Sequence, residues 1–380
     1  MTASRVSGLS PYIPGEQPGK GTGKKYIKLN ANENPWPPSP GTVEALRTAD
    51  PELMSLYPDP DSGRLREAIA GMLNRYGGVL SGERTAGFPE ITPEMLFCGN
   101  GSDEILSFIF YGFFEGPRPL VLPSLTYSFY PVYAGYYNIP LRRVPLRSDF
   151  TLDIEVMLNG DSCGMIFANP NAPTGIGISR DSIRDILDRW PRDRAVVIDE
   201  AYVDFGGETV LPLLGEYENL IVVRTFSKSM AFAGMRLGYA VASPGTIRTL
   251  VTVKNSFNHF PVDSICQRAA AAACGDSEYY RGTCGAIISE RDRFSASLRE
   301  AGWRVLPSQT NFVLAEHPRL SGAEVYRKLK EAGILVRHFD IPGISNFVRI
   351  SIGTGDQMKK LLGAVNNLVL NGGGIPPQYE

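Results

Sequence analysis

Residues 224–240, RTFSKSMAFAGMRLGYA, decide the fold of this chain. They directly follow an apolar run at 220–223, whose length and composition predict a buried strand. Ligands of parallel sheets gather at the carboxyl ends of the strands, so we expect Lys228 at such an end. An amine removed from water there would act as a nucleophile. Taken alone, the same stretch fits an ordinary surface loop that carries a lysine.

The neighbours of Lys228 suit a phosphate. Thr225 and Ser227 supply small hydroxyl groups, and Arg236 follows eight residues after the lysine. A second anion site is predicted at GNGSDE, residues 99–104, because a glycine turn that opens a helix presents backbone N–H groups and the positive end of the helix dipole. The alternative there is an ordinary helix cap.

Two further strand ends carry polar residues. The apolar run 196–198 ends in Asp199, and Tyr202 follows three residues later. Such a carboxylate could pair with a cationic ring nitrogen, and the phenol could donate to a phenolate oxygen; the alternative is an acid that caps the next helix. The turn NPNAPTG, residues 169–175, follows another apolar run, although Asn, Pro and Gly favour turns whatever the function.

The pattern of apolar runs predicts an α/β fold. Up to about residue 260, helical stretches alternate with short apolar runs at 120–122, 165–167, 196–198 and 220–223. Continuous apolar strands separated by helices predict a mostly parallel sheet with helices on both faces. We expect an unpacked N-terminal arm at 1–40 that joins the small domain or a dimer contact, a large domain at 41–265 and a small α+β domain at 266–380.

Individual elements are also predicted. One helix follows Ser62 and stops at Gly77, and another covers residues 287–302. Ser321 and Glu324 form a capping-box pair for a third helix. Two strands are expected at 334–337 and 347–352.

The composition excludes several classes of protein. Among 380 residues, 38 Lys and Arg face 40 Asp and Glu, so the formal charge of −2 gives no general attraction to nucleic acid or anionic membrane. No apolar stretch is long enough for a membrane span. Five cysteines without a CxxC pattern and three scattered histidines predict neither a disulfide framework nor a metal site. The N-terminus shows no signal peptide, so a cytoplasmic location is expected.

Together the motifs are far more specific than they are singly. The turn with Pro-Thr-Gly, then Asp-x-x-Tyr, then Ser-Lys with an arginine eight residues on, resembles the fold-type I pyridoxal-phosphate enzymes of the aminotransferase class. Further segments resemble the histidinol-phosphate aminotransferase family over nearly the whole chain. These are PYIPG at 11–15, LNANENP at 29–35, YPD at 57–59, GNGSDE at 99–104, TY at 126–127, ILVR at 334–337 and VRISIGT at 348–354.

The resemblance implies a role for each motif. Lys228 would form the Schiff base with pyridoxal 5'-phosphate, Asp199 would pair with the ring nitrogen, and Tyr202 would hydrogen-bond the 3-oxygen. Tyr127 would stack on the ring. The residues implied around the cofactor phosphate are Gly101, Ser102, Asp103, Thr225, Ser227 and Arg236. Tyr57 would reach the cofactor phosphate of the neighbouring subunit, which implies a homodimer with shared active sites.

One position departs from the family pattern. The family's cofactor-contacting asparagine stands directly before Pro-Thr-Gly, where this chain has Ala172. Asn171 stands one residue earlier. Either the turn shifts and Asn171 reaches the 3-oxygen, or that hydrogen bond is lost and Tyr202 alone tunes the same oxygen.

Two arginines are predicted to bind the substrate. Strand alternation at residues 347–353 places Arg349 on the face away from most of its apolar neighbours, and Arg337 ends the preceding strand. The planar guanidinium binds phosphate or carboxylate, and two arginines on one ligand favour a dianionic phosphate. The alternative for Arg349 is a structural ion pair, for example with Asp340. Asn32 is a further candidate for the substrate pocket.

The resemblance therefore implies transamination of L-histidinol phosphate with 2-oxoglutarate, giving imidazole-acetol phosphate and glutamate in histidine biosynthesis. Two enzymatic alternatives stay open: an aromatic amino-acid aminotransferase, and a threonine-phosphate decarboxylase of the cobalamin pathway, whose substrate also carries a phosphate. A pyridoxal-phosphate-binding regulator is disfavoured, because the chain has no room or basic segment for a DNA-binding domain.

Overall fold

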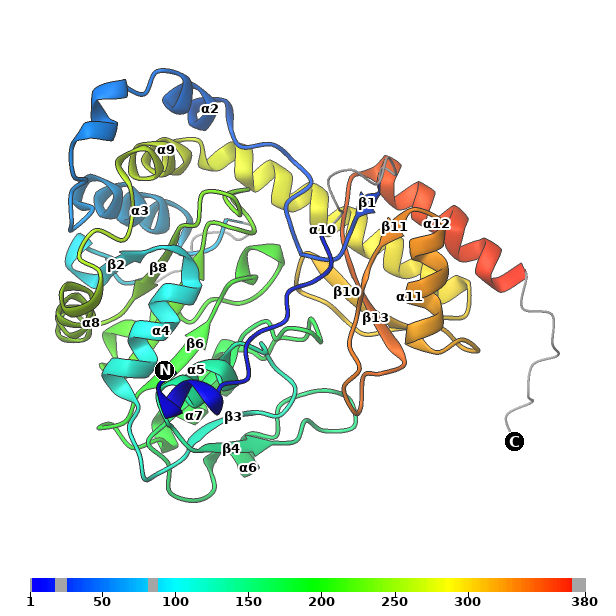
Figure 1. The fold of residues 1–380 in the computed structure, drawn as a ribbon, viewed down its shortest axis with the longest axis horizontal. Coiled ribbons are helices and arrows are strands. Elements are labelled where there is room, and N and C mark those ends of the chain that lie inside the picture. Colours follow the sequence, from blue (N-terminus) through cyan, green and yellow to red (C-terminus); the bar gives the residue numbers. More distant parts are fainter. Residues whose placement is uncertain (1, 18–25, 81–87, 371–380) are drawn as a thin grey trace.

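A seven-stranded sheet forms the centre of the larger part of the chain (Figure 1). The computed structural model describes residues 2–17, 26–80 and 88–370. The strand order is β2-β8-β7-β6-β5-β3-β4, and β8 alone runs antiparallel to its neighbours in this sheet. The strands are β2 (Leu96–Gly99), β3 (Leu120–Pro123), β4 (Leu141–Val144), β5 (Gly164–Ala168), β6 (Val196–Asp199), β7 (Leu220–Thr225) and β8 (Gly238–Val241). The predicted, mostly parallel α/β sheet is confirmed.

Helices cover both faces of this sheet. In β6, Val196 and Ile198 join the core on one face, whereas Val197 joins the core on the other. This alternation explains the continuous apolar runs, because both faces of a central strand are buried. One face packs on α3 (Gly63–Tyr76), α6 (Ile154–Leu158), α7 (Arg180–Arg189) and α9 (Ser264–Gly275); the other packs on α4 (Gly101–Phe113), α5 (Tyr130–Tyr136) and α8 (Pro244–Phe257).

A smaller α+β unit follows the sheet. Its strands form an antiparallel sheet in the order β12-β13-β10-β9. The elements are α10 (Ser277–Glu300), β9 (Arg304–Val305), β10 (Phe312–Glu316), α11 (Gly322–Glu331), β11 (Ile334–Leu335), β12 (Arg337–His338), β13 (Phe347–Ser351) and α12 (Gly355–Leu370). Figure 1 shows α10 as the long helix that bridges the two units. The division of the chain at residues 40 and 265 stays a prediction.

The N-terminal residues bind the small unit. After α1 (Ser4–Ser7), strand β1 (Ile27–Lys28) pairs in parallel with β11, and Leu29, Asn30 and Asn32 behind it are buried. The prediction of an unpacked arm is therefore wrong for residues 27–32. Their backbone groups are satisfied by β11 and by the end of β13, where the N–H of Ser351 donates to Leu29 O. Helix α2 (Pro40–Arg47) then packs on α9.

Most predicted elements are present with shifted ends. Helix α3 ends at Gly77 as predicted, and the Ser321–Glu324 capping box of α11 is confirmed. Helix α10 begins at Ser277, earlier than predicted, because Tyr280 and Cys284 continue its buried face. The strand predicted at 334–337 is two short strands, since β11 pairs with β1 whereas β12 pairs with β13.

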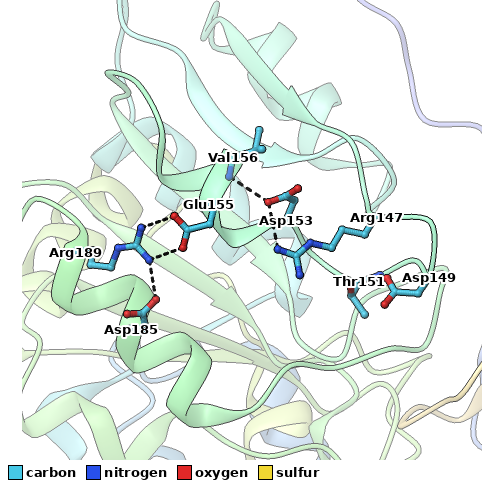
Figure 2. A network of polar contacts seen from close by, with 8 residues as sticks. All are labelled: Arg147, Asp149, Thr151, Asp153, Glu155, Val156, Asp185 and Arg189. Carbon is cyan, nitrogen blue, oxygen red and sulfur yellow. Dashed lines mark hydrogen bonds and ion pairs between the residues drawn. The ribbon is translucent and has the colours of Figure 1, made fainter.

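A polar network joins α6 to α7 at the surface (Figure 2). The two carboxylate oxygens of Glu155 accept hydrogen bonds from Arg189, both at 2.7 Å. Arg189 also donates to a carboxylate oxygen of Asp185 at 3.0 Å. Asp153 caps α6 and lies 3.5 Å from Arg147. These side chains are largely exposed, so each pair contributes about 1 kcal/mol or less to stability.

In the part of the chain that the structure describes, none of the helices has the length and apolar character needed to cross a membrane.

His317 is buried at the turn before α11 and gives a testable pH dependence. Its Nδ1 accepts the N–H groups of Arg319 and Leu320, both at 3.0 Å, so the neutral ring is required. Burial lowers the pKa of His317. The pKa of His317 is therefore lower in the folded protein than in the unfolded chain. The contribution of the neutral ring to stability is complete above about pH 6.5 and is lost as pH falls through the folded-state pKa.

We predict that His317→Asn, which keeps an acceptor but cannot titrate, flattens the loss of thermal stability between pH 7.5 and pH 5. Thermal unfolding of both proteins across this range measures it. Parallel curves for the two proteins would show that His317 does not contribute.

Candidate active site

The carboxyl ends of β5, β6 and β7 meet the start of α4, and this is where most of the predicted residues lie. Residues of β6 pair directly with residues of β5 and β7, so Asp199 and Thr225 end neighbouring strands. The backbone of β8 returns beside β7, where Gly238 approaches α4 so closely that a Cβ on it would lie 2.5 Å from the nitrogen of Ser102. The fold thus brings a carboxylate, an amine and a helix start to one place.

Asp199 is a buried carboxylate with a restricted set of partners. One oxygen accepts the hydroxyl of Tyr130 at 2.8 Å, and the other accepts the N–H of Ala201 at 3.1 Å. Burial nevertheless raises the pKa of Asp199 to about 6. A cationic group against this carboxylate would restore its ionised form. The geometry therefore fits a protonated ring nitrogen.

Tyr202 lies in a hydrogen-bonded chain that reaches the small unit. Its hydroxyl accepts the side-chain amide of Asn32 at 2.9 Å, and Asn32 in turn accepts the hydroxyl of Ser351 at 3.0 Å. The Nζ of Lys228 lies 5.8 Å from the centre of the Tyr202 ring and 3.4 Å from the carbonyl of Ala31. Lysine, phenol and Asn32 thus meet at the junction of the two units.

The start of α4, together with Thr225, Ser227 and Arg236, forms a site with donors for an anion, called here the anion cradle. Arg236 crosses it: one guanidinium nitrogen is 3.1 Å from a carboxylate oxygen of Asp103, and the other donates to Ser227 at 3.4 Å. A Cβ on Gly101 would lie 2.5 Å from this guanidinium, and Gly101 has φ +77°, so only glycine leaves the room. Thr225 accepts the N–H of Ser227 at 3.1 Å. The predicted phosphate residues, with Ser102 at the second position of α4, are therefore neighbours.

Tyr127 stands between the cradle and the Asp199 carboxylate. Its hydroxyl donates to Asp103 at 2.9 Å, and its ring packs edge-on against Tyr130 with centroids 5.5 Å apart. The ring also lines an open cavity. A flat ligand held by Asp199 and the cradle would therefore meet an aromatic wall.

Asn171 is engaged within its own turn. Its amide nitrogen donates to the carbonyl of Leu125 at 3.1 Å and to the hydroxyl of Thr174 at 3.0 Å. Its buried Oδ1 has no hydrogen-bond partner among the described residues, so it keeps an acceptor for a ligand donor. Ala172 lines the cavity. The contact of Asn171 with a cofactor oxygen stays a prediction.

Arg337 and Arg349 lie directly opposite each other on β12 and β13, so both side chains leave the same face of the sheet. Both line a cavity of about 620 Å³, with Tyr127, Tyr12 and Pro173 among its other walls. Arg349 donates to Asn30 O at 3.2 Å, and its buried Nε has no partner among the described residues. Burial lowers the pKa of Arg349. A partly buried guanidinium is stabilised by an anion.

Arg337 holds the N-terminal residues over this cavity. It donates to the carbonyls of Ile13 at 3.1 Å and Pro14 at 3.3 Å. Tyr12, next to them, packs on Phe129 with ring centroids 5.0 Å apart. The segment drawn in dark blue in Figure 1 therefore spans from the large unit to the small one.

Tyr57 stands apart from these residues. Its side chain is 83% exposed and its ring stacks on Phe260, with centroids 4.6 Å apart. The cavity that holds Arg337 and Arg349 does not include it.

Sequence reasoning missed three residues that shape the site. Tyr130 holds Asp199, and no motif points to it. Arg224 and Glu200 form a buried ion pair with contacts of 2.6 and 2.9 Å, directly beside Asp199 and Thr225 in sequence. The sequence signal for this ion pair was Arg224 inside an apolar strand, because a buried charge needs a partner of opposite charge.

The donor set fits pyridoxal phosphate. Among the described residues, Asp199 has no cationic partner at one end of the site, and the cradle of α4 and Arg236 offers anion contacts at the other. The primary amine of Lys228 lies near, 3.4 Å from the carbonyl of Ala31. Such a set can bind a phosphorylated, cationic ring and attach its carbonyl carbon to an amine.

Comparisons with known proteins agree with this chemistry. The family model "Aminotransferase class I and II" matches residues 24–365. A histidinol-phosphate aminotransferase of Syntrophus aciditrophicus is 50% identical, covering 97% of this chain and 98% of the relative. Another, from Pseudomonas putida KT2440, is 43% identical over 95% of this chain and 98% of its own.

A solved structure has the same fold. The histidinol-phosphate aminotransferase of Sinorhizobium meliloti, in complex with pyridoxal-5'-phosphate, superposes with a TM-score of 0.79 at 26% identity, covering 92% of each chain.

We predict that the Arg224–Glu200 ion pair stabilises the strand ends that carry Asp199 and Thr225. Arg224→Met should lower the free energy of unfolding by about 3–5 kcal/mol, because it leaves the buried Glu200 carboxylate unpaired. The double variant Arg224→Met/Glu200→Gln should lose less than the sum of the single variants. Urea unfolding measures all three, and strictly additive losses would mean that the two charges are not coupled.

Proposed function

Because this chain belongs to the class I and II aminotransferases, and within them to the histidinol-phosphate aminotransferases, we propose that it transfers the amino group of L-histidinol phosphate to 2-oxoglutarate. The products are imidazole-acetol phosphate and glutamate, and the cofactor is pyridoxal phosphate. The observation that carries the substrate assignment is the pair Arg337 and Arg349. Both line one cavity, and no carboxylate lines it among the described residues.

The residues that would hold the cofactor come from both ends of the site. Asp199 would hold the ring nitrogen, Tyr202 the 3-oxygen and Tyr127 the ring face. The phosphate would be held by Gly101, Ser102, Asp103, Thr225, Ser227 and Arg236. When bound, pyridoxal phosphate supplies an electron sink for the electrons of the bond broken at the substrate's α-carbon.

Lys228 would carry the reacting proton. Its Nζ would take the proton from the α-carbon of the substrate and deliver it to the carbon on the far side of the transferred nitrogen. Asp199, ionised beside a cationic ring nitrogen, would keep that nitrogen protonated. The hydrogen bond of 2.9 Å from Asn32 to Tyr202 would fix the phenol beside the lysine, and it ties the N-terminal segment to the large unit.

Arg349 and Arg337 would hold the phosphate of the substrate. The unpartnered Nε of Arg349 and the remaining donors of Arg337 match the oxygens of a phosphomonoester. The same groups would accept the distal carboxylate of 2-oxoglutarate. The segment at residues 12–14 lies over the cavity and would limit the access of water to it.

We further propose that two copies share their active sites in a cytoplasmic homodimer. Met54, Leu56, Tyr57 and Phe257 are 74%, 67%, 83% and 76% exposed, which is unusual for large apolar side chains. A second copy covering them would place Tyr57 against the partner's site. The five cysteines are all free thiols, which favours a reducing compartment.

The substrate is tested by one half-reaction. We expect protein loaded with pyridoxal phosphate to lose its visible absorbance rapidly when mixed with L-histidinol phosphate without any oxo acid, and Lys228→Ala to show no such change. Phenylalanine and threonine phosphate run in parallel. Faster conversion of phenylalanine would identify an aromatic aminotransferase, and carbon dioxide release from threonine phosphate would identify a decarboxylase.

Substrate binding by the arginine pair has its own test. Arg349→Ala should raise the Michaelis constant for L-histidinol phosphate by at least tenfold, because a charge-assisted bidentate contact is lost. Steady-state kinetics measure this value. An unchanged Michaelis constant would locate the phosphate elsewhere.

Shared sites are tested by mixing two inactive variants. A heterodimer of Lys228→Ala and Tyr57→Ala subunits has one site with both residues intact if Tyr57 crosses the interface. Random mixing of equal amounts should then restore about a quarter of the wild-type activity. Activity that merely averages those of the separate variants would show that Tyr57 serves its own subunit.

A further inference from the structure

The cavity that holds Arg337 and Arg349 has a second basic wall. Arg143, in the edge strand β4, lines the same cavity together with Ser124, Ser128 and Gly135 of the large unit. Arg337 and Arg349 belong to the small unit. The cavity therefore lies between the two units, with arginine on both walls.

The side chain of Arg143 makes no polar contact that stabilises the fold among the described residues. Its neighbour Arg142 is pinned by hydrogen bonds to the carbonyls of Val156 and Met157, both at 2.8 Å. Arg143 points away from that side, because successive residues of a strand alternate. It is exposed, and it has no ion-pair or hydrogen-bond partner among the described residues.

The charge of the cavity is uniform. Three arginines line it, and none of the described lining residues is an aspartate or glutamate. The chain as a whole is nearly neutral, with a formal charge of −2. A cavity with one sign of charge concentrates ligands of the opposite sign, and attraction to an exposed group is screened by salt. The cavity of about 620 Å³ has room for a small ligand at its mouth as well as at its inner end.

We propose that Arg143 forms an outer anion subsite that captures the anionic group of substrates at the mouth of the cavity and passes it to Arg337 and Arg349. The ligand class is a phosphomonoester in one half-reaction and a dicarboxylic oxo acid in the other. This subsite rests on the proposed function. Its effect falls on the encounter with substrate, so it changes kcat/KM and leaves kcat as it is.

The test compares a phosphorylated substrate with an analogue that lacks the phosphate. In Arg143→Gln, kcat/KM for L-histidinol phosphate should fall about fivefold at low salt, with kcat unchanged. The value for L-histidinol should not fall, because this analogue has no phosphate for Arg143 to attract. The loss should shrink at 0.5 M KCl, and Arg143→Lys, which keeps the charge, should retain most of the wild-type value.

Arg147→Gln is the matched control. It removes one positive charge four residues away, where Arg147 pairs with Asp153 outside the cavity (Figure 2). It should match the wild type with both substrates. An equal loss in this control would show that only the net charge matters, and would overturn the subsite.

A titration that needs no turnover separates the subsite from the proposed function. Calorimetry with inorganic phosphate on protein loaded with pyridoxal phosphate should show weaker binding for Arg143→Gln than for wild type at low salt. If L-histidinol phosphate is not converted but this difference is present, the proposed function fails and the subsite stands. Equal phosphate binding, an unchanged kcat/KM, or an equal loss with L-histidinol would each overturn the subsite.

Discussion

One buried carboxylate organises this molecule. Asp199 ends the central strand β6, where both faces of the sheet are covered. Among the described residues its carboxylate accepts two hydrogen bonds, from Tyr130 and Ala201. An ionised group in that position is costly unless a cation meets it. We propose that the ring nitrogen of the cofactor supplies this cation. The strands on either side, the start of α4 and the side chain of Lys228 are arranged around that one requirement.

The rest of the site is assembled from parts that are distant in the sequence. Asn32 from the N-terminal segment, Tyr202 from the large unit and Ser351 from the small unit form one hydrogen-bonded chain. Arg337 fastens the same N-terminal segment across the cavity that Arg337 and Arg349 line. The two units and the segment are therefore coupled at the place where the reaction occurs, so a change in their relative position would alter the lysine and the arginines together.

The sequence was sufficient for the fold class and for the neighbourhood of the site. Apolar runs predict the parallel sheet because both of its faces are buried, and residues at strand ends converge because parallel strands end at one edge. The sequence did not predict the roles of Tyr130, Glu200 and Arg224. These roles depend on which elements become neighbours in space, and one sequence alone does not give that order. The prediction of an unpacked arm was wrong at residues 27–32 because a two-residue strand carries too little periodicity to be recognised, although β1 is fixed by its pairing with β11.

The most direct test of the central role of Asp199 is the ¹⁵N chemical shift of the ring nitrogen in protein loaded with ¹⁵N-labelled pyridoxal phosphate. We expect this nitrogen to be protonated in the wild type from pH 6.5 to pH 8.5, and to lose its proton in Asp199→Ala over the same range. A ring nitrogen that is equally protonated in both proteins, or unprotonated in the wild type, would contradict the account.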